Sequence, residues 1–274
     1  MSRKRIAWHP AFHEAIQAEL IDYHDVLTFE AEHVLNTEPL RVDVLIIKNP
    51  KNTIIKKNIG TIFKAVNIVE FKSRTDNFSY DDFHKVCAYT NLFLTLNKMP
   101  VTDITMTIIL TSLPRIIVKY IEKSCGYSIF KKYPGIHEIL GNMFPIQIIE
   151  TKELSEAENI WLSGLGRSID ISGIENIFLE QNRIRDKIHL DAYLNVIAEA
   201  NRDVMMEVLK VSKTKTALRE MIIEVGLADE WKNEKGFEVA ETMYAEGESI
   251  EKISKYTKIS VKELMEYFKI NVDE

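Results

Sequence analysis

Short β-prone apolar runs recur through the first 150 residues, and helical patterns separate several of them. The clearest runs are RVDVLIIK, AVNIVEFKS, ITMTIIL and PIQIIE, at residues 41–48, 65–73, 104–110 and 145–150. Apolar runs of this length are typical of strands that are buried in a sheet. Strands that alternate with helical patterns predict an α/β domain. We therefore expect a mixed central sheet that is flanked by helices.

The helical patterns lie before, between and after these runs. Near the N-terminus, Phe12, Ile16 and Leu20 recur every four residues. Ser79 and Asp82 have the spacing of a capping box, which predicts the start of a helix over residues 80–96. From about residue 154 onward the pattern is almost wholly helical. We therefore expect an α/β domain over residues 1–154 and an all-helical C-terminal region over residues 155–274.

The composition is that of a globular protein. Hydrophobic residues make up 46% of the 274 residues and charged residues 28%. No apolar run has the length of a membrane span, and the basic N-terminus lacks the apolar segment of a secretory signal. Cys87 and Cys125 are the two cysteines, a number typical of a reducing compartment. We expect a cytoplasmic protein without a membrane partner.

Charge is unevenly distributed along the chain. The formal net charge is −6, which argues against a surface that is basic throughout. Between Lys48 and Arg74, however, seven basic residues accompany one acid, Glu70. This basic segment is either a solvated hairpin whose lysines protect a sheet edge or a surface that guides a polyanion. The sequence leaves both interpretations open.

The run NIVEFKS places Glu70 and Lys72 on one face of a predicted strand, because side chains at i and i+2 point the same way. Buried charges are costly unless they are paired or bind a metal. Asp43 adds an acid to a neighbouring predicted strand. Two carboxylates suit Mg²⁺ or Mn²⁺, and a nearby lysine can orient or deprotonate a water. The pattern predicts either a metal-dependent site or a buried ion-pair network.

The order helix, strand, strand with Asp43, strand with Glu70 and Lys72, helix, strand resembles the PD-(D/E)XK nuclease core over residues 10–115. The similar branch is that of recombination-promoting nucleases or putative transposases. The resemblance implies a restriction-endonuclease-like αβββαβ core and metal-dependent hydrolysis of DNA, with Asp43 and Glu70 as metal ligands and Lys72 as the catalytic lysine. Val42 stands where the motif has a proline. Glu38 is the alternative first carboxylate, in a segment more typical of a turn.

The same resemblance suggests three further candidate site residues. Lys85 and Tyr89 match a Q-x-x-x-Y motif with lysine in place of glutamine, and their i, i+4 spacing puts them on one helix face. They are equally consistent with a surface lysine and a half-buried tyrosine. Glu14, on the first helix, is a candidate metal ligand or an ordinary surface glutamate. His9 and His13 are interpreted as the start of that helix.

The alternative to an enzyme is a non-catalytic module of the same fold, which would bind nucleic acid or a protein partner. The tail at residues 249–267 has the rhythm of a helix-turn-helix, and we interpret it as a packing or self-association element. Its second helix lacks the Arg, Asn and Gln side chains that read base edges. The C-terminal helices, including those between residues 175 and 210, are candidates for a homo-oligomer interface. The residues expected to form the core of the tail are Ile250, Ile253, Ile259, Val261 and Leu264.

Overall fold

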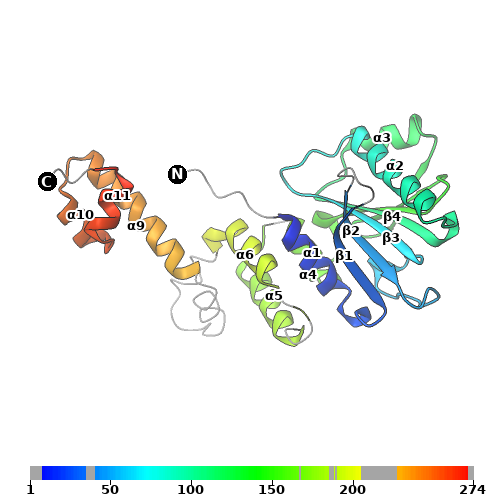
Figure 1. The fold of residues 1–274 in the computed structure, drawn as a ribbon, viewed down its shortest axis with the longest axis horizontal. Coiled ribbons are helices and arrows are strands. Elements are labelled where there is room, and N and C mark those ends of the chain that lie inside the picture. Colours follow the sequence, from blue (N-terminus) through cyan, green and yellow to red (C-terminus); the bar gives the residue numbers. More distant parts are fainter. Residues whose placement is uncertain are drawn as a thin grey trace. The chain divides into compact units, whose positions relative to one another are not determined.

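The computed structural model describes residues 8–34, 41–166, 168–184, 188, 190–204 and 227–270 (Figure 1). The chain divides into two compact units, Met1–Arg202 and Asp203–Glu274. The first unit contains a β-sheet with helices α1 to α6, and the second contains helices α9, α10 and α11. None of the described helices combines the length and the apolar character needed to cross a lipid bilayer.

A seven-stranded mixed sheet forms the centre of the first unit, which confirms the expected α/β class. The strand order is β1-β2-β3-β4-β7-β6-β5. Strand β4 runs parallel to both of its neighbours, β3 and β7, and the other neighbouring strands are antiparallel. The strands are β1 Leu27–Val34, β2 Arg41–Lys48, β3 Val66–Lys72, β4 Ile104–Leu110, β5 Ser128–Tyr133, β6 Ile136–Leu140 and β7 Ile146–Glu150.

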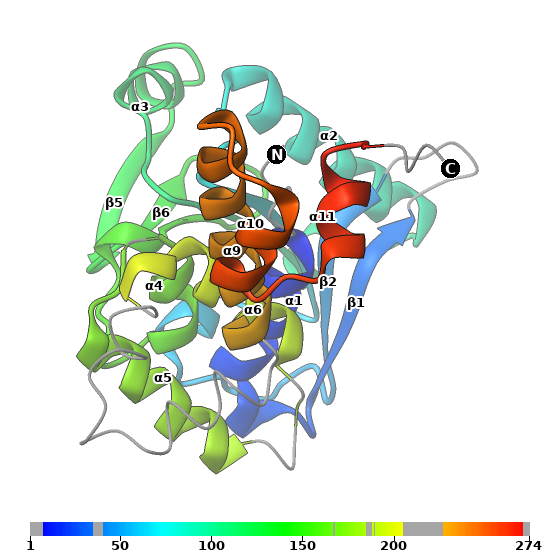
Figure 2. The same ribbon diagram turned by 90° about the vertical axis from the view of Figure 1, so that its left-hand side faces the viewer.

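Helices cover both faces of this sheet (Figures 1 and 2). Helix α1 (Trp8–Glu19) packs on one face, where Phe12 stacks on Phe71 of β3 with ring centroids 4.3 Å apart. Helices α2 (Tyr80–Leu96) and α3 (Arg115–Lys123) cover the other face and share an apolar core with Ile68. Successive residues of β3 therefore point alternately to α1 and to α2, as the two-residue period of a strand requires.

The start of α2 confirms the predicted capping box. The Ser79 hydroxyl accepts a hydrogen bond from the Asp82 backbone N–H, and the Asp82 carboxylate accepts one from the Ser79 N–H. These bonds satisfy two backbone donors that a helix otherwise leaves free. They also fix Asp82 close to the end of β3, because the chain leaves β3 at Lys72 and enters α2 at Tyr80.

The boundary between the compact units lies at residues 202 and 203, not near residue 154. Helices α4 (Ile160–Gly166), α5 (Ile171–Ile184) and α6 (Asp191–Ala200) belong to the first unit. Both α4 and α6 pack on α1. Carboxylates of α1 bind the starts of these helices: Glu19 accepts from the Trp161 N–H and Glu14 from the Tyr193 N–H. The C-terminal half is helical as expected, but its first helices complete the α/β unit.

The second unit contains the predicted pair of short helices, α10 (Ile250–Thr257) and α11 (Val261–Tyr267), together with α9 (Leu227–Ala245). Ile253, Ile259 and Leu264 are buried as expected. Val261 is 37% exposed and stands outside this core, and Ala240 of α9 takes part instead. The prediction for Val261 was wrong because the core is completed by a third helix.

Candidate active site at the end of strand β3

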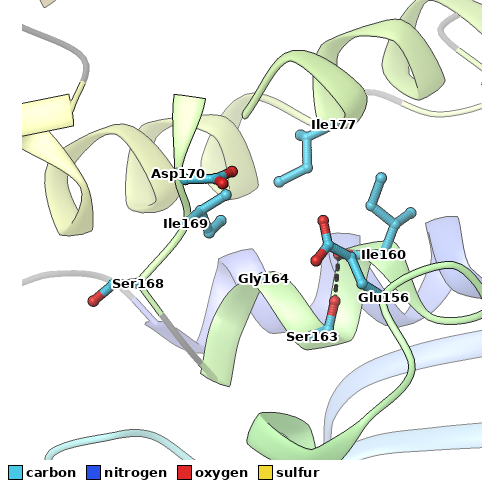
Figure 3. A pocket seen from close by; sticks show the side chains of 8 residues that line it. All are labelled: Glu156, Ile160, Ser163, Gly164, Ser168, Ile169, Asp170 and Ile177. Atoms are coloured by element: carbon cyan, nitrogen blue, oxygen red, sulfur yellow. Dashed lines mark hydrogen bonds between the residues drawn. The ribbon is translucent and has the colours of Figure 1, made fainter. Parts of the chain in front are cut away.

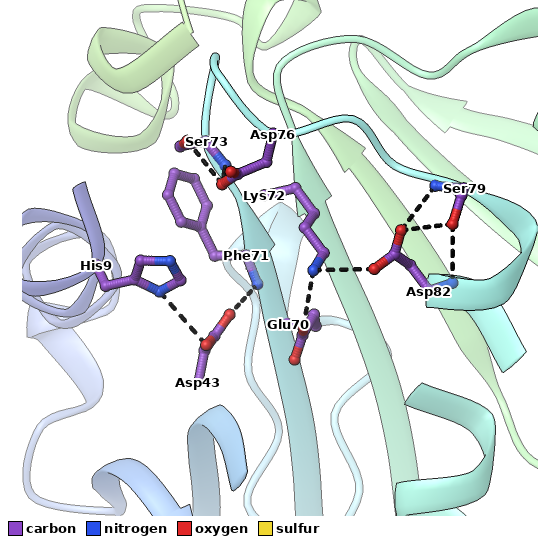
Figure 4. A network of polar contacts seen from close by, with 9 residues as sticks. All are labelled: His9, Asp43, Glu70, Phe71, Lys72, Ser73, Asp76, Ser79 and Asp82. Atoms are coloured by element: carbon purple, nitrogen blue, oxygen red, sulfur yellow. Dashed lines mark hydrogen bonds and ion pairs between the residues drawn. The ribbon is translucent and has the colours of Figure 1, made fainter. Parts of the chain in front are cut away.

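The structure brings Asp43, Glu70 and Lys72 together at the end of strand β3 (Figure 4), where Lys72 pairs with Glu70 and the charge of Asp43 acts on Glu70. Strands β2 and β3 pair with Val44 opposite Val69. Asp43 and Glu70 are the next residues beyond this pair, so both lie at the same end of the two strands, and Glu70 points to the face that α2 covers. Lys72 follows Glu70 by two residues and shares that face. Glu38, the alternative to Asp43, lies outside the described residues.

Asp43 is held from two sides. Its Oδ2 accepts a hydrogen bond from the Phe71 backbone N–H at 2.7 Å, and its Oδ1 lies 3.4 Å from His9 Nδ1. The hydrogen bond with Asp43 raises the pKa of His9 although burial of the ring opposes this. The His9 side chain, on the first turn of α1, is 51% exposed. The sequence led us to interpret His9 as part of a helix start, and its place beside Asp43 was not anticipated.

Lys72 lies between two carboxylates. Its Nζ is 3.3 Å from Glu70 Oε1 and 3.2 Å from Asp82 Oδ1. Burial alone would lower the pKa of Lys72, but the two negative neighbours outweigh burial and raise it. Lys72 is therefore a cation at neutral pH, able to donate hydrogen bonds but unable to act as a base. Asp82 was seen in the sequence as a helix cap and was missed as the second partner of Lys72.

Glu70 is the most strongly perturbed group of this cluster. Its side chain is 8% exposed. Its pKa is raised from 4.5 to about 7: burial is the largest cause, the negative charge of Asp43 adds to the increase, and Lys72 and Lys85 oppose it. Two nearby carboxylates that disfavour each other's ionisation are stabilised when a cation binds between them. The electrostatics of Glu70 and Asp43 therefore suit a bound cation.

The donor atoms indicate which cation fits. Among the residues that the structure describes, no group of three or more His, Cys, Asp or Glu side chains is placed to hold a metal ion. Mg²⁺ does not require such a group, because it binds through one or two carboxylates and keeps several water molecules. The oxygen donors of Asp43 and Glu70 fit Mg²⁺ or Mn²⁺, and His9, the histidine that the structure places beside them, does not by itself make the nitrogen- and sulfur-rich ligand set of a typical zinc site.

Lys85 and Tyr89 share one face of α2, with the Lys85 Nζ 5.5 Å from the centroid of the Tyr89 ring. Lys85 is exposed, and its charge lowers the pKa of Glu70. Tyr89 is 9% exposed and belongs to the apolar core. The Lys85 ammonium group is thus available to a ligand, and the buried Tyr89 ring lies next to it.

Glu14 lies at a different place. Its two carboxylate oxygens accept hydrogen bonds from the backbone N–H groups of Ala192 and Tyr193, at 3.2 and 2.6 Å. These groups begin α6, where a negative charge also interacts favourably with the helix dipole. We therefore assign Glu14 to the attachment of α6 to α1 and leave it out of the metal-binding set.

Replacing Glu14 by alanine is expected to lower the free energy of unfolding by about 1 kcal/mol, because α6 loses its capping acceptors. Urea unfolding measures this loss, and Glu14→Gln, which keeps one acceptor, should lose less. Isothermal titration calorimetry with Mn²⁺ then measures the metal affinity of the same variants. A clear loss of Mn²⁺ affinity in a folded Glu14→Ala protein would contradict the placement of Glu14 outside the metal-binding set.

Five of the seven basic side chains in the segment from Lys48 to Arg74 are engaged by other groups of the protein. Lys57 Nζ lies 2.7 Å from Glu19 Oε1, and Lys51 Nζ lies 3.3 Å from Asp103 Oδ2. Lys48 is buried and donates to the Phe63 carbonyl. Lys72 pairs with two carboxylates, and Arg74 lies over the Trp8 ring. These contacts argue against the interpretation that the segment guides a polyanion.

A hollow of about 220 Å³ lies between α4 and α5 and shares no residue with the Asp43 cluster (Figure 3). Its polar groups serve the local structure. The Ser163 hydroxyl donates to the Ile160 carbonyl, and Asp170 caps α5 by accepting from the Gly173 N–H. We therefore place the candidate active site at β3.

Comparison of the chain with protein-family models, with curated proteins and with solved structures found no match. The assignment of a function therefore depends on the geometry and chemistry of the cluster.

Proposed function

We propose that the protein is a Mg²⁺- or Mn²⁺-dependent nuclease that hydrolyses DNA phosphodiester bonds. The observation that carries the proposal is the meeting of Asp43, Glu70 and Lys72 at the same end of two neighbouring strands. The element order α1-β1-β2-β3-α2-β4 agrees with the αβββαβ core that the resemblance implies. A restriction-endonuclease-like core, and a link to mobile elements or recombination, belong to this proposal through the resemblance alone.

Asp43 and Glu70 would hold the metal ion. When bound, the ion would lower the pKa of a water and withdraw negative charge from the phosphate. The Phe71 N–H holds Asp43 Oδ2 in place, so that the carboxylate is oriented before a ligand arrives. Orientation of this kind avoids reorganisation during the reaction.

Lys72 would act as a donor to the substrate. An ammonium group has three N–H bonds, and two of them are directed to Glu70 and Asp82. The third is left for a phosphate oxygen, where a fixed positive charge stabilises the charge that develops in the transition state. Its raised pKa favours this role over deprotonation of the attacking water. Lys85 adds a second positive charge from α2.

The alternative is a non-catalytic module with the same fold that binds nucleic acid or a protein partner. The observation that favours it is the engagement of Lys72 by two carboxylates, which would satisfy its charge without a substrate. Such a network would be structural. Activity measurements separate the two functions.

The deciding experiment is nicking of supercoiled plasmid with Mg²⁺ or Mn²⁺. Asp43→Asn is expected to slow nicking by about 10²–10³-fold, the equivalent of several kcal/mol of metal-dependent stabilisation. Asparagine keeps an oxygen acceptor for the Phe71 N–H, so the fold should persist. Asp103→Asn is the matched control, because it removes a carboxylate that pairs with Lys51 and leaves the cluster intact.

Nicking that requires a divalent ion and survives in Asp103→Asn would support the nuclease. Absence of nicking by the wild-type protein with both ions would favour the non-catalytic module. Equal nicking by wild type and Asp43→Asn would show that the activity comes from elsewhere.

A further inference from the structure

Helix α3 carries a basic stripe, defined here as Arg115, Lys119 and Lys123. The three side chains are exposed and follow one another at four-residue intervals, so they lie on one face of the helix. The opposite face holds Ile117 and Ile121, which are 1% and 0% exposed. The basic stripe therefore points away from the core.

The charges of the basic stripe are unfavourable for the helix alone. Like charges at i and i+4 repel, and both neighbouring pairs of the stripe have this spacing. Arg115 is also the first residue of α3, where the helix dipole disfavours a positive charge. Within the described part of the chain, none of the three forms an ion pair, although the acid Glu122 lies on the same helix. An external polyanion would relieve this repulsion.

Strand pairing puts the start of α3 at the same end of the sheet as the candidate active site. Strands β3 and β4 are parallel, and Lys72 pairs with Leu110, the last residue of β4. Arg115 follows Leu110 by five residues, a span of at most about 18 Å. Parallel pairing therefore brings both segments to one edge of the sheet.

Side-chain contacts hold α3 against the first turns of α2. The Tyr120 hydroxyl and His84 Nε2 form a hydrogen bond, and the rings of Tyr120 and Tyr80 lie 5.5 Å apart. Asp82 and Lys85 belong to the same turns of α2. Figures 1 and 2 both show α3 next to the start of α2. The helix that carries the basic stripe is thus packed against the turns of α2 that carry Asp82 and Lys85.

We propose that the basic stripe of α3 binds the phosphate backbone of the nucleic acid that enters the candidate active site. The inference rests on the proposed function for the identity of the polyanion. Neighbouring members of the stripe are about 6 Å apart along the helix axis, a spacing that lets each one neutralise a different phosphate. Contacts of this kind position a duplex without reading its sequence and release counterions on binding.

The chain offers a matched control at the other end of the sheet. Lys64 precedes β3, Lys98 precedes β4, and Lys56 lies in the connection between β2 and β3. All three are exposed, and none forms an ion pair within the described residues. Replacing these lysines by glutamine changes the net charge by the same amount as replacing the stripe. Lys56 and Lys64 also represent the basic segment that the sequence suggested as the binding surface.

Binding of a fluorescein-labelled DNA duplex to the full chain, followed by anisotropy in EDTA and again in Ca²⁺, tests the proposal. The triple variant Arg115→Gln, Lys119→Gln, Lys123→Gln is expected to bind at least about 10-fold more weakly than wild type. The slope of log K against log salt should fall by about 2–3, close to one for each lost phosphate contact. The control triple variant should stay within about 2-fold of wild type.

Equal weakening in both triple variants, or no weakening in the stripe variant, would overturn the proposal, as would a wild-type protein that does not bind the duplex. A thermal melt of the stripe variant at or above the wild-type temperature is expected, because the substitutions remove like-charge pairs. Failure of the proposed function has a different signature: the wild-type protein would bind DNA through α3 and still not nick plasmid with Mg²⁺ or Mn²⁺.

Discussion

Glu70→Gln is expected to stabilise the metal-free protein by about 3 kcal/mol at pH 8. Burial raises the pKa of Glu70 from 4.5 to about 7, and each pH unit of difference from the unfolded chain corresponds to about 1.36 kcal/mol. At pH 8 the wild-type protein keeps this carboxylate ionised in a buried place beside Asp43. Glutamine has nearly the same shape and never ionises.

The direction of the pH dependence follows from the raised pKa. Protonated Glu70 stabilises the folded state fully below pH 4.5, and this contribution is lost as the pH rises to about 7. The advantage of Glu70→Gln should therefore be small at pH 4.5, grow up to about pH 7 and stay constant above it. Urea unfolding in EDTA at several pH values measures it. The exposed Glu122→Gln control should differ from wild type by less than about 0.5 kcal/mol throughout.

The same substitution is expected to abolish metal-dependent nicking, since it removes one of two proposed ligands. Mg²⁺ should raise the unfolding free energy of the wild-type protein at pH 8 and leave Glu70→Gln unchanged, because a ligand stabilises only the state that binds it. Gain of stability and loss of activity in one variant would identify a site that is strained for function. A variant with the same pH dependence as the wild-type protein would contradict the perturbed state of Glu70.

The three central residues could be predicted because their arrangement depends on local periodicity. A two-residue interval in a strand places Glu70 and Lys72 together, and an acid within an apolar run identified Asp43. The partners of these residues could not be predicted in this way. Asp82 reaches Lys72 only because the chain turns back from β3 into α2, and His9 reaches Asp43 from another helix.

Long-range packing also explains the other differences between expectation and structure. The lysines of the basic segment looked free in the sequence, but Lys51 pairs with Asp103 and Lys57 with Glu19. Strands β5 and β6 were not anticipated, since much of β5 is exposed and lacks the apolar run of a buried strand. Helices α4 and α6, which the sequence assigned to the C-terminal region, are recognisable as part of the first compact unit only through their contacts with α1.

Lys57→Met is expected to lower the free energy of unfolding by about 3–5 kcal/mol, the usual cost of leaving a buried charge without its partner. The Glu19 side chain is 1% exposed and lies 2.7 Å from Lys57. Burial raises the pKa of Glu19, and Lys57 with the N–H groups of Leu162 and Trp161 opposes the increase. Because Lys57 is itself 26% exposed, water can replace part of its effect, so we expect the lower end of the range.

A double-mutant cycle shows whether charge or packing causes this loss. Glu19→Gln keeps an acceptor for the N–H groups at the start of α4 and needs no cation. The pair Glu19→Gln with Lys57→Met should therefore be more stable than Lys57→Met alone by at least about 1 kcal/mol. The single variant should also lose more stability at pH 8 than at pH 5, since its Glu19 is ionised at a higher cost. Lys56→Met, at the exposed neighbouring position, should change little. Additive losses in the cycle would mean that Lys57 contributes by packing, whereas the expected coupling would make Glu19 and Lys57 an electrostatic link between α1 and the connection from β2 to β3.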